Sequence, residues 1–134
     1  ARRQRQMCIR DRQSRGFPNA FFFGPAQSGF TATYTYSLDE QSVHLAHILG
    51  KARERGANRI EASERAETEW VKTIIEKARL TADFQEKCTP GYYNNEGNVN
   101  TKPQNNTYGG GPIEFFGLME KWREQGDLDG LELT

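Results

Sequence analysis

The stretch GFPNAFFFGPAQSGFTATYTY, residues 16–36, sets the expectation for the fold. Its apolar run at residues 20–23 follows the turn pair Pro18-Asn19 and is stopped by Gly24-Pro25. A short apolar run between turn residues is typical of a strand buried on both faces. Small and hydroxylated residues follow, and then a helical pattern. We therefore expect a strand, a tight turn and a helix, where α/β proteins place a ligand against helix amides. An ordinary junction that binds nothing fits the same pattern.

The first helix is expected within residues 37–55. Ser37 and Glu40 have capping-box spacing, although the helix could begin earlier, near Thr33. His44 and His47 are three residues apart with no further ligands nearby, so we expect partly exposed histidines and no metal pair. The predicted apolar stripe is Leu45, Ile48, Leu49 and Ala52.

Two more helices follow from the same periodicity. A helix at 63–80 has Ser63 as its predicted N-cap, with acids in its early turns. A helix at 112–125 has Pro112 in its first turn. Their predicted buried stripes are Ala66, Trp70, Ile74 and Ala78 in one and Ile113, Phe116, Met119 and Trp122 in the other. The leucines near the C-terminus predict an extended tail on the body.

Between these helices, residues 88–111 show no period. A loop of this length inside a compact domain is usually functional or mobile. The pair Tyr92-Tyr93 favours a loop that docks on something over a plain linker.

Composition limits the class of protein. Hydrophobic residues make up 35% of 134 residues, and the mean hydropathy is −0.85, so a self-sufficient core would be thin. An isolated strand with no neighbours also indicates a missing sheet. Cys8 and Cys88 give no disulfide framework or metal cluster, and no apolar window spans a membrane. A reducing, cytoplasmic setting is expected.

The formal net charge of zero hides an arginine-rich arm at residues 1–15. Such an arm on an acidic body would suggest nucleic-acid binding. However, Met7-Cys8-Ile9-Arg10-Asp11 looks like the translation of a transposase adapter used in sequencing libraries. We expect residues 1–15 to be a non-native segment and leave them out of fold reasoning.

Four segments carry a family resemblance: GFPNAFFFGPAQSGFTAT with SLDEQSVHLAHIL, AETEWVKTIIEKA, CTPGYYNNEG and YGGGPIEFFGLMEKW. In this order they resemble the C-terminal part of the FAD-binding domain of Baeyer–Villiger-type flavin monooxygenases, the cyclohexanone and phenylacetone monooxygenase-like family. The resemblance covers residues 16–134. It implies an α/β fragment of a flavoprotein with two Rossmann-like dinucleotide-binding domains. The fragment itself would be mostly α-helical, with one buried strand and a long loop.

The chain contains no GxGxxG, so neither phosphate cradle is in it. The family's catalytic arginine is also absent, so we assign no catalytic residue and no metal ligand. The resemblance implies that the turn faces the flavin's pyrimidine edge, where backbone amides would stabilise the negative charge of reduced flavin. The implied cofactor-binding residues are Gly24, Pro25, Ala26, Gln27 and Ser28. The implied substrate-binding residues are Phe30, Thr31 and Thr33, although a place for Phe30 in the core fits the sequence equally well. The implied residues of the mobile loop are Tyr92, Tyr93 and Asn94.

The function implied by the resemblance uses FAD and NADPH. The complete enzyme would insert one oxygen atom of O₂ into a ketone through a C4a-peroxyflavin, giving an ester or lactone. The fragment alone would be inactive, and its partner is the missing N-terminal part of the same polypeptide. Two alternatives stay open: a heteroatom-oxidising flavin monooxygenase, and a small basic-armed nucleic-acid-binding module.

Overall fold

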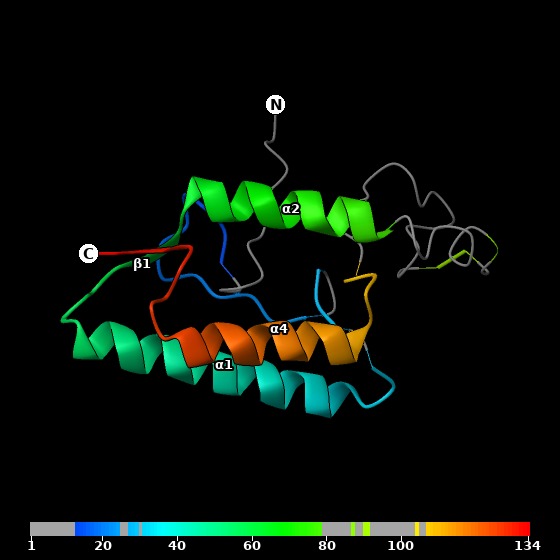
Figure 1. Cartoon of the computed structure of the whole chain (residues 1–134), viewed down its shortest axis with the longest axis horizontal. Coiled ribbons are helices and arrows are strands. Elements are labelled where there is room, and N and C mark those ends of the chain that lie inside the picture. Colours follow the sequence, from blue (N-terminus) through cyan, green and yellow to red (C-terminus); the bar gives the residue numbers. More distant parts are fainter. Residues whose placement is uncertain are drawn as a thin grey trace.

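The computed structural model describes residues 13–24, 27–29, 31–78, 87, 90–91, 104 and 107–134. Within these ranges the elements are α1 (Tyr34–Glu54), β1 (Ile60–Ala62), α2 (Glu64–Ala78), α4 (Pro112–Gln125) and β2 (Leu131–Leu133). Helices α1 and α4 lie side by side and run in the same direction, while α2 runs the opposite way across α4 (Figure 1). The mostly helical character expected from the sequence is confirmed.

The strand expected at residues 20–23 is wrong. This segment has no regular structure: Phe21 and Phe22 are half-buried, and the side chain of Phe23 is 45% exposed. A strand needs a neighbour for its backbone groups, and the described part of the chain pairs no strand with these residues. Phe21 instead packs against the cluster around Ile60 and Trp122.

The sheet is formed by β1 and β2, which sequence reasoning missed because three residues are too few to show a period. The strands pair antiparallel, with Ile60 opposite Leu133 and Ala62 opposite Leu131. The expected extended tail on the body is confirmed, because residues 131–133 are extended as β2 and Leu131 and Leu133 pack against the core cluster that contains Ile60. Glu61 and Glu132 face each other as like charges, which destabilises a strand pair. Arginines offset this, because Arg59 lies 2.6 Å from Glu61 and Arg15 lies 3.5 Å from Glu132.

The other edge of β1 is covered by Asn19. Its backbone N–H donates to the carbonyl of Ile60 at 2.9 Å, and the N–H of Ile60 donates to the Asn19 side chain at 2.8 Å. Asn19 has a φ of +58°, a conformation that asparagine tolerates better than most residues. Asn19 thus pairs with both backbone groups of Ile60, and the side chain of Gln13 donates to the same carbonyl at 3.0 Å.

Helix α4 lies between two core clusters. Towards α2 it contributes Phe115 and Met119, which pack with Trp70 and Tyr108. Towards α1 it contributes Trp122, which packs with Ile48. The stripe predicted for α2 is buried in full, and Ser63 accepts the N–H of Ala66 as its N-cap.

The stripes predicted for α1 and α4 are confirmed in part, since Ile48 and Ala52 in one and Met119 and Trp122 in the other are buried. Leu49 is 47% exposed and Ile113 is 88% exposed. His44, expected to be partly exposed, is completely buried against Trp122. Ser37 lies inside α1 instead of capping it, because the helix begins at Tyr34. The buried positions are Ser37, Gln41, His44, Ile48 and Ala52 in α1 and Phe115, Met119 and Trp122 in α4.

Residues 13–15 belong to the folded body. Gln13 is fully buried and donates from its side chain to the carbonyl of Ile60, and Ser14 donates to Glu67. We propose that a foreign segment, if residues 1–15 contain one, ends before Gln13; residues 1–12 lie outside the described residues. None of the helices in the described ranges has the length and apolarity that crossing a membrane requires.

Candidate functional site

Gly24 and residues 27–29, the described part of the expected turn and called the turn at 24–29 below, lie where α1 and α4 both begin. The N–H of Tyr108 donates to the carbonyl of Ser28 at 3.0 Å, and the hydroxyl of Ser37 donates to the carbonyl of Gly29 at 3.2 Å. Figure 1 shows both helix N-termini at this end of the molecule, away from the sheet. The turn is thereby held between the two helices.

Within the turn, Gln27 has a strained backbone. Its φ of +54° lies in the left-handed region, which costs a non-glycine residue about 1 kcal/mol or more. The Ser28 hydroxyl closes the turn by donating to the carbonyl of Gly24 at 2.8 Å. Strain of this kind persists where surrounding contacts over-determine a conformation, and it is common at ligand sites.

Only one of the two polar atoms of the Gln27 side chain has a hydrogen-bond partner among the described residues. Its amide nitrogen donates to the carbonyl of Gln104 at 2.7 Å, while its amide oxygen is buried and has no partner in the part of the chain that the structure describes. A buried acceptor without a donor is costly. This oxygen could accept a hydrogen bond from a ligand N–H.

Gly29 allows α4 to approach the turn closely. A Cβ at this position would lie 2.9 Å from Cδ1 of Phe115 and 3.0 Å from Cα of Pro112. Both distances are shorter than ordinary van der Waals contact. Any larger residue would push the turn and the start of α4 apart.

The N-terminus of α1 lies at the earlier of the two starts that the sequence allowed, near Thr33. The helix begins at Tyr34, and its N-cap Thr33 makes no side-chain capping bond. The first turn of α1 contains no acid, so its positive end is not offset by its own side chains. The hydroxyl of Thr31 is bonded to the N–H and carbonyl of Thr33, so it is already occupied locally.

An open hollow of about 800 Å³ lies between α1 and α4 at this end. Thr31 and Thr33 line it together with the rings of Tyr36 and Phe116, which contact edge to face at 5.4 Å. Arg123 and Glu40 also line the hollow and lie 3.7 Å apart, and Glu120 adds a second carboxylate. The hollow therefore combines aromatic rings with charged side chains.

Tyr108 lies just before α4, near the end of the range 88–111 for which the sequence predicts a loop. Its ring stacks on Trp70 at 5.6 Å, and its hydroxyl donates to Glu114, which also accepts from Lys77 at 3.0 Å. Burial and the neighbouring Glu114 carboxylate raise the pKa of Tyr108 strongly. The hydrogen bonds from Tyr108 and Lys77 lower the pKa of Glu114.

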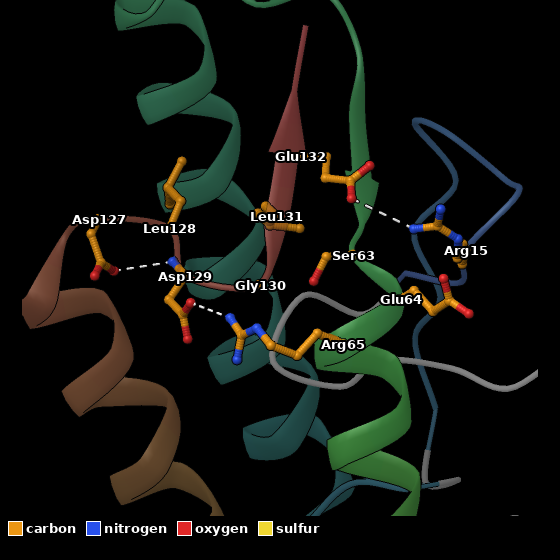
Figure 2. A pocket seen from close by; sticks show the side chains of 10 residues that line it. All are labelled: Arg15, Ser63, Glu64, Arg65, Asp127, Leu128, Asp129, Gly130, Leu131 and Glu132. Carbon is orange, nitrogen blue, oxygen red and sulfur yellow. Dashed lines mark hydrogen bonds and ion pairs between the residues drawn. The ribbon is translucent and has the colours of Figure 1, made fainter.

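A second hollow, of about 500 Å³, lies at the opposite end beside β2. Figure 2 shows two ion pairs in it, Arg65 with Asp129 and Arg15 with Glu132, beside the carboxylates of Glu64 and Asp127. The lining therefore holds four carboxylates and two guanidiniums and has a net negative charge. None of these lining residues has a buried side-chain polar atom without a partner, whereas Gln27 at the turn does, so we place the candidate site at the turn. No group of three or more potential metal ligands occurs within the described ranges.

Five of the predicted site residues can be placed: Gly24, Gln27, Ser28, Thr31 and Thr33. They lie together along residues 24–33, at the start of α1. The other predicted site residues, Pro25, Ala26, Phe30, Tyr92, Tyr93 and Asn94, lie outside the described residues. Sequence reasoning missed Ser37, Gln41 and Tyr108. Ser37 and Gln41 are spaced four apart on one helix face, a signal that an apolar-stripe search passes over.

No family model matches the chain. It is 49% identical over 122 residues to pentalenolactone D synthase of Streptomyces exfoliatus, 90% of this chain and 21% of the relative. It is 40% identical over 113 residues to a Baeyer–Villiger monooxygenase of Streptomyces coelicolor, and the match covers 84% of this chain and 18% of that relative. It is 37% identical over 120 residues to an FAD-binding monooxygenase of Hypomyces subiculosus, and the match covers 89% of this chain and 20% of that relative. The chain spans about a fifth of the length of these relatives.

The solved structures that resemble this chain include monooxygenases as well. The polycyclic ketone monooxygenase of the fungus Thermothelomyces thermophila superposes with a TM-score of 0.83 at 27% identity, over 94% of this chain and 21% of that structure. An oxidised steroid monooxygenase bound to NADP superposes with a TM-score of 0.75 at 18% identity, over 96% of this chain and 23% of that structure. The second likeness concerns the fold alone.

Proposed function

Since the chain belongs to the Baeyer–Villiger-type FAD-binding monooxygenases, we propose that the complete protein oxidises a ketone to an ester or lactone. NADPH would supply two electrons, one atom of O₂ would enter between the carbonyl carbon and a substituent, and the other would leave as water. The observation that carries this proposal is the relation to monooxygenases over nine-tenths of the chain.

The residues present fit one end of FAD. The unpartnered amide oxygen of Gln27 suits the N–H of the flavin's pyrimidine ring, and the uncapped start of α1 suits negative charge. Nothing in the sequence suits the phosphates, because it has no glycine-rich phosphate loop. We propose Gly24, Pro25, Ala26, Gln27 and Ser28 as the contribution of this chain to the flavin site. When bound, the flavin supplies electron transfer and O₂ chemistry.

The proposed substrate side begins just past the turn. Thr31 and Thr33 line the aromatic hollow, and Phe30 stands between them and the turn in the sequence. We propose that Phe30 walls the ketone pocket, and that Tyr92, Tyr93 and Asn94 belong to a loop that closes over it. Phe30→Ala should then shift selectivity towards bulkier ketones by roughly 10- to 200-fold. An unchanged ranking across a ketone panel would contradict this assignment.

We further propose a cytoplasmic location, because two cysteines in 134 residues offer no disulfide framework of the kind secreted domains use.

The test of the function uses the complete polypeptide that contains this chain. The purified protein should carry FAD, and a ketone should accelerate its consumption of NADPH. Under ¹⁸O₂, mass spectrometry should find one labelled oxygen in the ester. If ketones give no product while organic sulfides or amines are oxidised, the protein is a heteroatom-oxidising monooxygenase and the proposal fails.

A further inference from the structure

The buried face of α1 begins with polar side chains. Ser37, Gln41 and His44 lie along one stripe and are 1%, 0% and 0% exposed, whereas the stripe continues with Ile48 and Ala52. A core-facing helix stripe is ordinarily apolar, and a buried polar group is costly unless it is hydrogen-bonded. The first two of these residues satisfy each other and the turn at 24–29.

A chain of three hydrogen bonds joins α1 to both ends of that turn. The N–H of Gly24 donates to the side-chain oxygen of Gln41 at 3.4 Å, the longest of the three. The side-chain nitrogen of Gln41 donates to the hydroxyl of Ser37 at 3.1 Å. That hydroxyl donates onward to the carbonyl of Gly29 at 3.2 Å. The pair Ser37–Gln41 is called the clamp below.

The order of donors and acceptors determines which residues can form the clamp. One end of the turn offers a donor, at Gly24, and the other offers an acceptor, at Gly29. The glutamine amide has both functions, and the serine hydroxyl converts the amide's donor into a donor for Gly29. An apolar residue at either position would leave a turn end without its partner on α1.

The opposite side of the turn is fixed separately. Tyr108 donates its N–H to Ser28, and Phe115 packs directly against Gly29. The turn is therefore held from two directions, by α4 and its preceding residues and by the clamp. Losing one set of contacts would displace the turn without removing its fold.

We infer that Ser37 and Gln41 are positioning residues that set where the turn at 24–29 stands relative to α1, and hence the environment of the flavin. The flavin part of this inference rests on the proposed function. Neither residue would touch the cofactor. Both act through the backbone of Gly24 and Gly29.

The test compares Ser37→Ala and Gln41→Leu in the complete protein. The matched control is Ser42→Ala, which also replaces a serine of α1 by alanine. The hydroxyl of Ser42 is exposed and donates to the carbonyl of Leu38 in its own helix. Gln41→Glu is the conservative variant, since a carboxylate can still accept from Gly24. Two measurements are made: amide hydrogen exchange of Gly24 and residues 27–29, and the absorption spectrum and reduction potential of the bound flavin.

Ser37→Ala and Gln41→Leu should speed exchange of the turn at least tenfold and shift both the spectrum and the potential. Gln41→Glu should give exchange rates and flavin properties between those of these two variants and those of the unmodified protein. Ser42→Ala should leave both the exchange rates and the flavin properties unchanged. Faster exchange with an unchanged spectrum and potential would show a purely structural clamp and overturn the inference. Unchanged exchange in Ser37→Ala would overturn it as well. Absence of flavin from the unmodified protein would instead refute the proposed function, and the exchange measurement would still report on the clamp.

Discussion

Gly29 and Gly50 lack a side chain in opposite surroundings. A Cβ at Gly29 would collide with Phe115 and Pro112, whereas a Cβ at Gly50, on the exposed face of α1, would meet nothing within 4 Å. Gly29→Ala should therefore destabilise the protein by about 1–3 kcal/mol through overpacking. Gly50→Ala should stabilise it by up to about 1 kcal/mol, because alanine is the better helix former. Urea denaturation of both variants measures the difference. Equal effects of the two changes would mean that α4 does not press on the turn.

The contacts of Glu114 predict that the free energy of unfolding depends on pH. Hydrogen bonds from Tyr108 and Lys77 lower the pKa of Glu114, so its carboxyl group binds a proton less tightly in the folded state than in the unfolded chain. The stabilisation is then present above the ordinary glutamate value of about 4.3 and is lost as the pH falls through the lowered value. Glu114→Gln should flatten the fall of the denaturation midpoint between about pH 5 and pH 3.

The control for this prediction is Glu120→Gln on the same helix. Within the part of the chain that the structure describes, Glu120 makes no ion pair, so the acid limb of the stability curve should stay as steep as before. If both variants give the same curve, the contacts of Glu114 contribute nothing in solution.

At the scale of elements, the helices were predictable and their orientations only in part. Helix α2 follows its apolar period because its stripe packs in one cluster with Tyr108, Phe115 and Met119. Helix α1 buries Ile48 and Ala52 as its apolar period predicts, but its buried face continues through polar residues, Ser37 and Gln41 among them, and leaves Leu49 exposed. Ser37 and Gln41 hydrogen-bond to the backbone of the turn, and apolar periodicity contains no information about such bonds.

The strands show the reverse problem. The aromatic run at residues 20–23 has the composition of a strand but lacks a paired neighbour in the described ranges. β1 has no strand composition, yet it pairs on one edge with β2 and is covered on the other by Asn19. Pairing is a long-range property, so three-residue strands could not be read from local sequence.

The cover on β1 can be tested by Asn19→Ala. The change removes the acceptor for the N–H of Ile60, a residue that is only 4% exposed. An unsatisfied buried N–H costs about 1–3 kcal/mol, and the free energy of unfolding should fall by that amount. Asn19→Asp keeps the acceptor and should recover most of the loss. Should both substitutions cost the same, the backbone conformation of residue 19 matters and its side-chain bond does not.

At the scale of the molecule, the thin core expected from composition takes the form of two small clusters on either side of α4. Large apolar side chains remain exposed around the start of α1 and α4, among them Tyr34, Tyr36 and Ile113 at 42%, 50% and 88%. The relatives are more than four times as long as this chain. We therefore expect the rest of the complete protein to cover this surface.

Ile113 is the sharpest probe of that surface, because it is the most exposed of these residues and lines the aromatic hollow. In the isolated 134-residue chain, Ile113→Ser should change the free energy of unfolding by no more than about 0.5 kcal/mol, as surface substitutions do. In the complete protein it should cost about 1.5–3 kcal/mol, the value of burying an isoleucine side chain. Lys72→Ser, at a largely exposed position on α2, should be near neutral in both. Unfolding measured by circular dichroism on the four variant proteins decides the matter. A cost that is equally small in both backgrounds would mean that Ile113 stays in water, and that this end of α4 faces solvent in the complete protein.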